Sequence, residues 1–201
     1  MKAKIRRCYQ TVTYMSEDVI LQAKTDIELY KDFLQGNREA FNMIIRRYRK
    51  SLIAFIMKYV RSYEAAEDLA QDTFVYVLVN QTEYDFKYSL RTYLYTIAKC
   101  RAINYLKKQK RVVLYDEAYM QEESFEMEDE LLKIEEKKKL YSAMKKLKRD
   151  YKIAVYLRDI LGFENKEVSK ILNKTMPQTK MIVYRGRKAL EKNLRKENEI
   201  C

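Results

Sequence analysis

Apolar side chains recur every three or four positions along most of the chain, which is the period of an amphipathic helix. After Gly36-Asn37, which indicates a helix stop followed by a cap, this pattern predicts a long helix that reaches Tyr59. A second helix is predicted over roughly 64–80 and a third from near Ser89 to about 106. The side chains predicted to face inward are Phe41, Ile44, Ile45, Tyr48, Leu52, Phe55, Ile56, Tyr59, Ala66, Ala70, Phe74, Val77, Leu78, Leu90, Leu94, Ile97, Ala98 and Tyr105.

The C-terminal part repeats this helical pattern and adds a characteristic turn. Leu140, Met144 and Leu147 indicate one helix, and Ile153, Leu157 and Leu161 indicate another that Gly162 ends. A short helix over 165–172 is followed by the turn Asn173-Lys174. Thr175 is a good N-cap, and Pro177 falls in the first turn of a last helix that runs to about Leu194. This order predicts a helix-turn-helix, with two ordinary core helices as the alternative.

Composition and charge divide the chain into parts. Three glycines and one proline in 201 residues leave few helix breakers, and 47% hydrophobic residues are enough for packed cores. We therefore predict an all-α fold. The segment 112–135 is acidic and has no Lys or Arg before Lys133. It indicates a linker between two small helical domains, a bundle over 25–111 and a helix-turn-helix domain over 136–197. Residues 1–24 show no clear pattern and form a tail of unknown role.

The overall charge points to a polyanionic partner. Lys and Arg number 41 against 29 Asp and Glu, so the formal net charge is +12. Nucleic acid is the leading candidate, and an anionic membrane surface is the alternative. No apolar run approaches the roughly 18 residues that span a bilayer, so we expect no membrane insertion. Cys8, Cys100 and Cys201 are far apart, which fits a reducing cytoplasm and favours neither disulfides nor a metal.

The sequence carries no visible catalytic constellation. There is no His to act as a general base and no Gly-rich phosphate loop. We therefore expect a non-catalytic protein without cofactor or metal; an enzyme that uses carboxylates alone is the remaining alternative.

Three charged features are candidates for binding surfaces. Segment 86–115 holds basic residues, interleaved aromatics and no acid, which suits phosphates and unpaired bases. Segment 174–196 holds the basic helix of the predicted helix-turn-helix, in which Gln178, Thr179, Lys180 and Met181 would meet base edges. Segment 64–74 places acidic side chains on one side of the second helix, where they would repel DNA and favour a protein contact. The residues of the acidic feature are Glu64, Glu67, Asp68, Gln71 and Asp72.

These motifs, in this order, resemble the extracytoplasmic-function group of sigma-70-type RNA polymerase sigma factors. The resemblance runs from about 26 to 195. It rests on GNREAFNMIIRRYRKSLIAFI (36–56), AAEDLAQDTFVYV (65–77), SLRTYLYTIAKCRAINYLKKQKR (89–111), GFENKEVSKILNKT (162–175) and YRGRKAL (184–190). The resemblance implies an alternative sigma factor that binds core polymerase, recognises −35 and −10 promoter elements and promotes DNA melting. The bundle would be sigma region 2 and the helix-turn-helix domain sigma region 4.

The resemblance also implies roles for particular residues. The second helix would bind the clamp coiled coil of the largest polymerase subunit, the loop 80–88 would capture a flipped −10 base, and an anti-sigma factor would mask both domains. The implied polymerase contacts are Glu67, Asp68, Gln71 and Asp72. The implied −10 contacts are Asn80, Lys87, Tyr88, Arg91, Tyr93, Tyr95, Lys99, Arg101, Lys107 and Lys108. The −35 contacts are Lys174, Thr175, Gln178, Thr179, Lys180, Met181, Tyr184, Arg185, Arg187 and Lys188.

The chain departs from the family's pattern in three places. Tyr93 stands where the family usually has Trp, and the loop before Ser89 is about one residue shorter. In the last helix, Gln178-Thr179-Lys180-Met181-Ile182 replaces the common Thr-Val-Lys-Ser-Arg, so the promoter sequence does not carry over. Two rival functions are a helix-turn-helix regulator that binds operator DNA alone and a basic adaptor that binds proteins or membranes.

Overall fold

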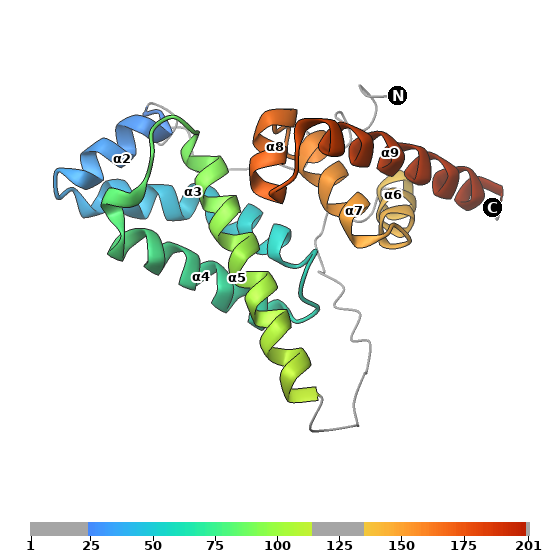
Figure 1. Cartoon of the computed structure of the whole chain (residues 1–201), viewed down its shortest axis with the longest axis horizontal. Coiled ribbons are helices and arrows are strands. Elements are labelled where there is room, and N and C mark those ends of the chain that lie inside the picture. The colour runs from blue at the N-terminus through green and yellow to red at the C-terminus, as the bar shows by residue number, and fades with distance from the viewer. Residues whose placement is uncertain (1–23, 114–134, 200–201) are drawn as a thin grey trace. The chain divides into compact units, whose positions relative to one another are not determined.

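The computed structural model describes residues 24–113 and 135–199, and within these ranges all regular structure is helical (Figure 1). The predicted all-α fold is thus confirmed. The described residues fall into two compact units, one in each range. The expected N-terminal tail up to residue 23 and residues 114–134 of the expected linker lie outside the described residues.

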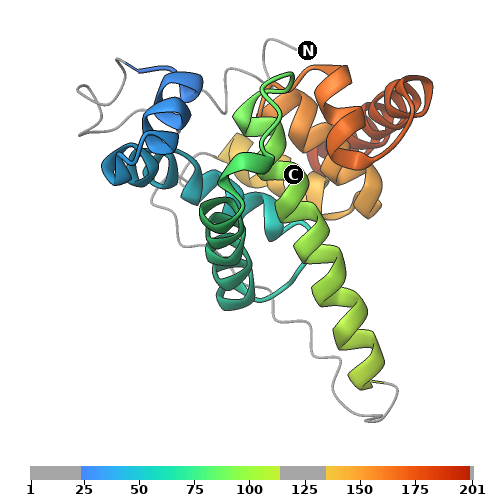
Figure 2. The same ribbon diagram turned by 60° about the vertical axis from the view of Figure 1, so that its left-hand side comes forward.

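The first unit is a helical bundle. Its elements are α2 (Asp26–Leu34), α3 (Arg38–Ile56), α4 (Tyr63–Val79), the 3₁₀ turn η2 (Gln81–Glu83) and α5 (Leu90–Val113). Helix α3 packs against α2, α4 and α5, and α4 also packs against α5. The C-terminal end of α5 projects beyond the other helices of this unit, as Figures 1 and 2 both show.

Side-chain caps determine where these helices begin. Thr25 and Glu28 form a reciprocal capping box at the start of α2. Gly36 ends α2 with a φ of 95°, and Asn37 then caps α3 by accepting hydrogen bonds from two backbone N–H groups. Ser62 accepts one from the N–H of Ala65 at the start of α4. Polar residues between apolar runs therefore fix the bundle's loops.

The core of the first unit agrees with the apolar periodicity in all but one position. The predicted inward residues are buried or half-buried, except Leu78, which is 47% exposed. The prediction for Leu78 is wrong because the buried stripe of α4 ends at Val77. The next residue is rotated by about 100° around the helix, and it points to solvent.

The second unit contains the predicted helix-turn-helix. Its elements are α6 (Glu135–Lys145), α7 (Arg149–Val155), the π-helical turn η4 (Tyr156–Ile160), α8 (Asn165–Leu172) and α9 (Met176–Glu199). Helix α9 packs against α6, α7 and α8, so it is the central element of the unit. It extends five residues beyond the predicted end near Leu194.

A π-helical turn separates α7 from the helix-turn-helix. All five residues from Ile153 to Leu157 are buried, which an α-helix with one buried stripe does not allow. The wider turn accommodates them, and the N–H of Leu161 donates to the carbonyl of Tyr156 at 2.9 Å. Gly162, with a φ of 73°, then reverses the chain so that Phe163 enters the core with no exposed surface.

The turn between α8 and α9 has the predicted geometry. Asn173 adopts the left-handed conformation with a φ of 54°, and the N–H of Lys174 donates to the carbonyl of Ser169 at 3.0 Å. At the start of α9 the N–H of Gln178 donates to the Thr175 hydroxyl at 3.4 Å. The N–H of Thr175 donates back to the Gln178 Oε1 at 3.0 Å. The predicted N-cap at Thr175 is therefore confirmed.

Two neighbouring residues hold α9 against α7 and η4. Gly186 is buried so closely against α7 that an added Cβ would lie 2.8 Å from the Val155 Cγ2 and 3.2 Å from the Tyr151 carbonyl oxygen. Arg187 donates two hydrogen bonds to the Asp159 carboxylate, from Nε at 2.9 Å and from Nη2 at 2.5 Å. These contacts fix both the distance and the rotation of α9.

We predict that Gly186→Ala destabilises the second unit by about 1 kcal/mol. Overpacking costs about 1–3 kcal/mol, and the better helix propensity of alanine returns up to about 1 kcal/mol. The penalty should shrink in a Val155→Ala background, where the nearest clashing carbon is absent. Hydrogen exchange of peptides from α7 and α9 measures both effects, and strictly additive losses would contradict this account.

We also predict that Arg187→Ala lowers the free energy of unfolding of this unit by about 2 kcal/mol. The Asp159 side chain is 13% exposed and would keep a poorly solvated charge without its partner. The matched control is Arg195→Ala, because Arg195 and Glu191 pair at the surface with 74% and 36% of their side chains exposed. That control should cost less than about 0.5 kcal/mol, and equal losses for the two variants would refute the distinction.

Candidate functional site

The acidic feature predicted from residues 64–74 lies on the outer surface of α4. Asp68, Gln71 and Asp72 are exposed, and their spacing of three and four residues places them on one side of the helix. Glu67 is half-buried and forms an ion pair with Arg49 of α3. The structure thus brings the expected polymerase contacts together on one helix, with Glu67 paired to Arg49 and the other three exposed.

The same side of α4 continues into an apolar patch that the sequence analysis missed. Val75 is 55% exposed, Leu78 47% and Val79 73%. These residues extend the spacing of Asp68, Gln71 and Asp72 toward the C-terminal end of the helix. The signal for this patch is the continued spacing: Leu78 is predicted to face the core, and Val75 and Val79 are assigned to neither side. Adjacent acidic and exposed apolar residues are typical of a protein-binding surface.

Arg101 of α5 connects the acidic surface to the basic helix. Its Nη1 lies 3.6 Å from the Asp72 carboxylate, and its guanidinium carbon lies 5.3 Å from the centre of the Tyr76 ring. The Tyr76 hydroxyl in turn donates to the Glu83 carboxylate at 2.6 Å. Arg101 was expected to contact DNA, but in the structure its charge is directed to α4.

An aromatic cluster organises the loop between α4 and α5. The buried Tyr84 ring lies 4.7 Å from the rings of Tyr30 and Phe86 and 5.3 Å from the ring of Tyr93. The Tyr30 hydroxyl donates to the carbonyl of Gln81 at 2.8 Å, and the Tyr84 hydroxyl donates to the carbonyl of Tyr88 at 2.6 Å. The loop is therefore held at both ends by buried rings.

Burial raises the pKa of the tyrosine hydroxyls in this cluster. It raises the pKa of Tyr84 to about 12 and that of Tyr93 to about 12, with smaller contributions from nearby acidic groups. Both therefore remain neutral hydroxyls near neutral pH. The Tyr93 hydroxyl is buried without a hydrogen-bond partner.

Two rings of the loop remain accessible. Phe86 is 43% exposed and Tyr88 37% exposed, and the Lys87 side chain between them is 84% exposed. Phe86 was absent from the expected −10 contacts, although the sequence places it among the interleaved aromatics. The Nδ2 of Asn80 donates to the carbonyl of Tyr76 at 2.9 Å, so this expected contact also ends α4. Accessible rings beside a lysine can stack unpaired bases.

The expected role of Tyr95 requires a correction. Its side chain has no exposed surface, and its ring lies 4.9 Å from that of Phe55 in the core. A buried ring cannot stack on a base. Tyr93 is half-buried and belongs to the Tyr84 cluster.

The basic residues of α5 are distributed along the helix. Lys107 and Lys108 are exposed on the projecting end, while Arg91 and Lys99 are half-buried nearer the loop. No acidic residue lies among them in the sequence. Exposed lysines such as Lys107 and Lys108 can neutralise phosphates without reading sequence.

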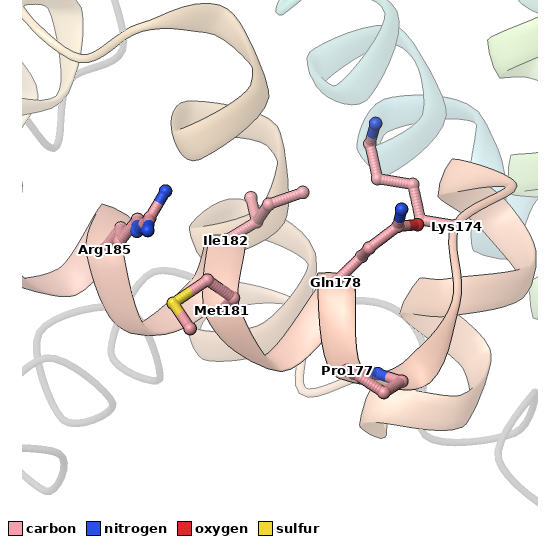
Figure 3. A pocket seen from close by; sticks show the side chains of 6 residues that line it. All are labelled: Lys174, Pro177, Gln178, Met181, Ile182 and Arg185. Atoms are coloured by element: carbon pink, nitrogen blue, oxygen red, sulfur yellow. The ribbon is translucent and has the colours of Figure 1, made fainter.

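In the second unit the exposed side of α9 forms the other basic surface. An open depression of about 440 Å³ lies along its first turns, with Lys174 and Arg185 at its two ends (Figure 3). Lys180, Met181 and Tyr184 are exposed, and the Lys188 ammonium lies 4.9 Å from the centre of the Tyr184 ring. Its interaction with Tyr184 raises the pKa of Lys188.

Three of the expected −35 contacts have other roles in the structure. Thr179 is fully buried and donates its hydroxyl hydrogen to the carbonyl of Thr175 at 3.0 Å. The prediction of direct DNA contact is therefore wrong for Thr179, whereas Arg187 is held by Asp159 with 28% of its side chain exposed. Gln178 is exposed, but its Oε1 accepts the capping hydrogen bond from Thr175. A bidentate contact with adenine would require that oxygen to leave the cap.

Neither described range contains a helix that is long and apolar enough to cross a membrane. Within these ranges no three His, Cys, Asp or Glu side chains gather in a group that could hold a metal ion.

Comparison with known proteins identifies the family. Residues 44–112 match the family model for sigma-70 region 2, and residues 137–190 match the model for sigma-70 region 4. The chain is 28% identical over 167 residues to the RNA polymerase sigma factor YlaC of Bacillus subtilis, which covers 81% of this chain and 96% of that protein. It is 27% identical over 176 residues to the ECF RNA polymerase sigma factor SigW of the same organism, covering 82% and 94%.

Solved structures show the same fold. The sigma factor RpoE of Bartonella quintana, solved with the anti-sigma factor NepR, superposes with a TM-score of 0.68 at 22% identity and covers 77% of this chain and 96% of that one. CnrH, solved with the cytosolic domain of CnrY, has a TM-score of 0.59 at 19% identity. The two matched regions, the relatives and the helical surfaces agree: the chain belongs to the extracytoplasmic-function group of sigma-70 RNA polymerase sigma factors, and it acts in promoter recognition and transcription initiation.

Proposed function

We propose that the two units have different tasks in a sigma factor. The first unit docks on polymerase and recognises the −10 element, and the second unit recognises the −35 element. In this proposal residues 25–111 act as region 2, residues 136–197 act as region 4, and the acidic segment 112–135 links them. The observation that carries the proposal is the separation of charge in the first unit. An exposed acidic side of α4 adjoins a basic α5 and an aromatic loop.

The exposed side of α4 is the proposed docking surface for core polymerase. Asp68, Gln71 and Asp72 would face basic side chains on the clamp coiled coil of the largest subunit. The apolar patch of Val75, Leu78 and Val79 adds area that becomes buried on docking. Apolar burial stabilises a complex by about 25 cal/mol per Å², while the acids mainly give specificity and a faster approach.

The loop and α5 are the proposed −10 surface. Phe86 and Tyr88 offer accessible rings to unpaired bases, and Lys87, Lys107 and Lys108 offer charge to the strand. Stacking is worth about 1–3 kcal/mol per base, which is comparable to the few kcal/mol that extruding a base costs. Two rings can therefore offset most of that cost.

No bond chemistry is needed for this function, and we propose that the chain is non-catalytic. Free energy from docking, phosphate contacts and stacking shifts the equilibrium of the promoter toward its open form. This requires differential binding of the open state, not a reactive group.

An anti-sigma factor is a further proposed partner. RpoE of Bartonella quintana was solved in complex with an anti-sigma factor, and the fold of that sigma factor matches this chain. A partner that covered the exposed side of α4 would compete directly with core polymerase. The same acids and apolar side chains would then serve both complexes.

Run-off transcription with purified core polymerase tests the proposed function as a whole. Addition of the full chain should produce discrete transcripts from genomic DNA templates that core polymerase alone does not produce. Operator binding by the chain without such transcripts would favour a conventional helix-turn-helix regulator. Vesicle binding without such transcripts would favour a basic adaptor.

Charge reversal at Asp68 and Asp72 should abolish co-purification with core polymerase while the fold remains intact. Both side chains are exposed, and the Asp72 ion pair with Arg101 is a surface pair worth less than about 1 kcal/mol, so helicity should change little. Affinity capture with tagged core polymerase measures the loss. The control reverses Glu39, an exposed acid of α3. Retained capture by the double variant, or equal loss by the control, would argue against this docking surface.

Replacement of Lys180 by alanine should weaken protection of the −35 element about tenfold. A lysine in the first turns of a recognition helix loses about 1–3 kcal/mol of contact when it is truncated. Footprinting of the holoenzyme on a promoter found by the run-off assay measures the change. Lys145→Ala is the control, because that exposed lysine lies on α6. An unaltered −35 footprint for Lys180→Ala would show that α9 lies differently on the DNA.

A further inference from the structure

We propose that Met181 reads the 5-methyl group of a thymine in the −35 element, which makes it a specificity-determining residue of this sigma factor. The inference rests on the proposed role of α9 in −35 recognition. It goes beyond that role by naming the base that is recognised and the side chain that contacts it.

The position of Met181 on α9 is fixed by the core. Thr179 and Val183, two residues to either side, are buried, with 0% and 4% of their surface exposed. Each residue turns an α-helix by about 100°, so Met181 lies on the side of α9 opposite the core. Its side chain is 48% exposed, and Figure 3 shows it projecting from the helix between Gln178 and Arg185.

The surroundings of Met181 form an apolar floor between two cations. Pro177, Met181 and Ile182, together with the polar Gln178, line the middle of the depression, and Lys174 and Arg185 stand at its ends. This arrangement suits a strand of DNA whose phosphates approach the cations and whose base edges approach the apolar side chains. A thioether donates no hydrogen bond and its sulfur is only a weak acceptor, so it is a poor partner for the polar edges of guanine, adenine and cytosine. Thymine is the base that presents a methyl group in the major groove.

The neighbouring side chains leave this reading to Met181. Thr179 is buried, and the Oε1 of Gln178 is occupied by the N-terminal cap of α9. The first turns of a recognition helix are the part that meets base edges. Met181, 48% exposed, is thus an apolar side chain that projects from the surface proposed to read the bases.

The experiment removes the methyl group from the DNA and the thioether from the protein. Holoenzyme made with the full chain selects binding sites from a duplex library that is randomised over the −35 element. Each thymine of the best site is then replaced by deoxyuridine, which lacks the 5-methyl group but pairs identically. Dissociation constants are measured for the natural chain, for Met181→Ala and for the control Met176→Ala. Met176 is 38% exposed on the same helix, on a side nearer the core.

One deoxyuridine replacement should weaken binding by the natural chain on the order of fourfold, the change expected from one buried methyl group. The same replacement should leave binding by Met181→Ala unchanged and should weaken binding by Met176→Ala as it does for the natural chain. Selection with Met181→Ala should lose the preference for thymine at that position.

Two results would overturn the inference. Either no deoxyuridine replacement affects the natural chain, or the natural chain and Met181→Ala lose affinity equally at the sensitive thymine. Run-off transcription from the selected site separates this failure from that of the proposed function. Promoter-dependent transcripts without methyl sensitivity refute the reading by Met181, whereas the absence of such transcripts refutes the role of α9 together with it.

Discussion

The close approach of α9 to α7 is the constraint on which the DNA-binding unit depends. Gly186 permits contact with Val155 and the backbone of Tyr151, and Arg187 fixes the rotation of the helix through Asp159. Once that rotation is set, Thr179 and Val183 must face the core and Met181 must face outward. The sequence specificity of the surface therefore follows from packing on the opposite side of the helix. A lysine could not replace Arg187 with the same effect, because it lacks the planar fork that binds both carboxylate oxygens.

Periodicity and capping residues were sufficient to predict the helices after Gly36, the turn of the helix-turn-helix and much of the core. They did not assign the buried Leu29, Tyr30 and Phe33 of α2. Gly36 with Asn37 and Thr175 with Gln178 act through local geometry, which the sequence contains in full. The errors concern residues that can be either buried or exposed. Tyr95 has a polar hydroxyl on a large apolar ring, and Thr179 has a hydroxyl on a small side chain, so either residue type can be buried or exposed. The ion-pair partner of Arg187 lies 28 residues away in the chain, so the local pattern does not reveal it. The identity of such a residue does not by itself determine whether its side chain faces the core or the solvent.

The apolar patch on α4 illustrates the same limit from the opposite direction. Leu78 was assigned to the core because it is apolar and follows Phe74 by four residues, but the buried stripe ends at Val77. In an isolated protein such exposure stabilises nothing. In the proposed function this patch is covered by a partner, and the adjacent Asp68 and Asp72 suit a partner that carries positive charge. A functional surface can thus be recognised where the helix pattern continues beyond what the core requires.

Preorganisation connects the aromatic core of the first unit to its proposed role in melting. An extruded base must find its stacking partners already in place, since ordering a flexible loop at that moment costs about 1–2 kcal/mol per residue. The Tyr30 hydroxyl holds the carbonyl of Gln81, and the Tyr84 hydroxyl holds that of Tyr88, so both ends of the loop are fixed by buried rings. Burial raises the pKa of Tyr84 to about 12, so its hydroxyl remains a donor above the pH at which an exposed tyrosine ionises. Folding of the unit therefore supplies the ordering cost in advance, and the stacking energy of Phe86 and Tyr88 remains available to the open strand.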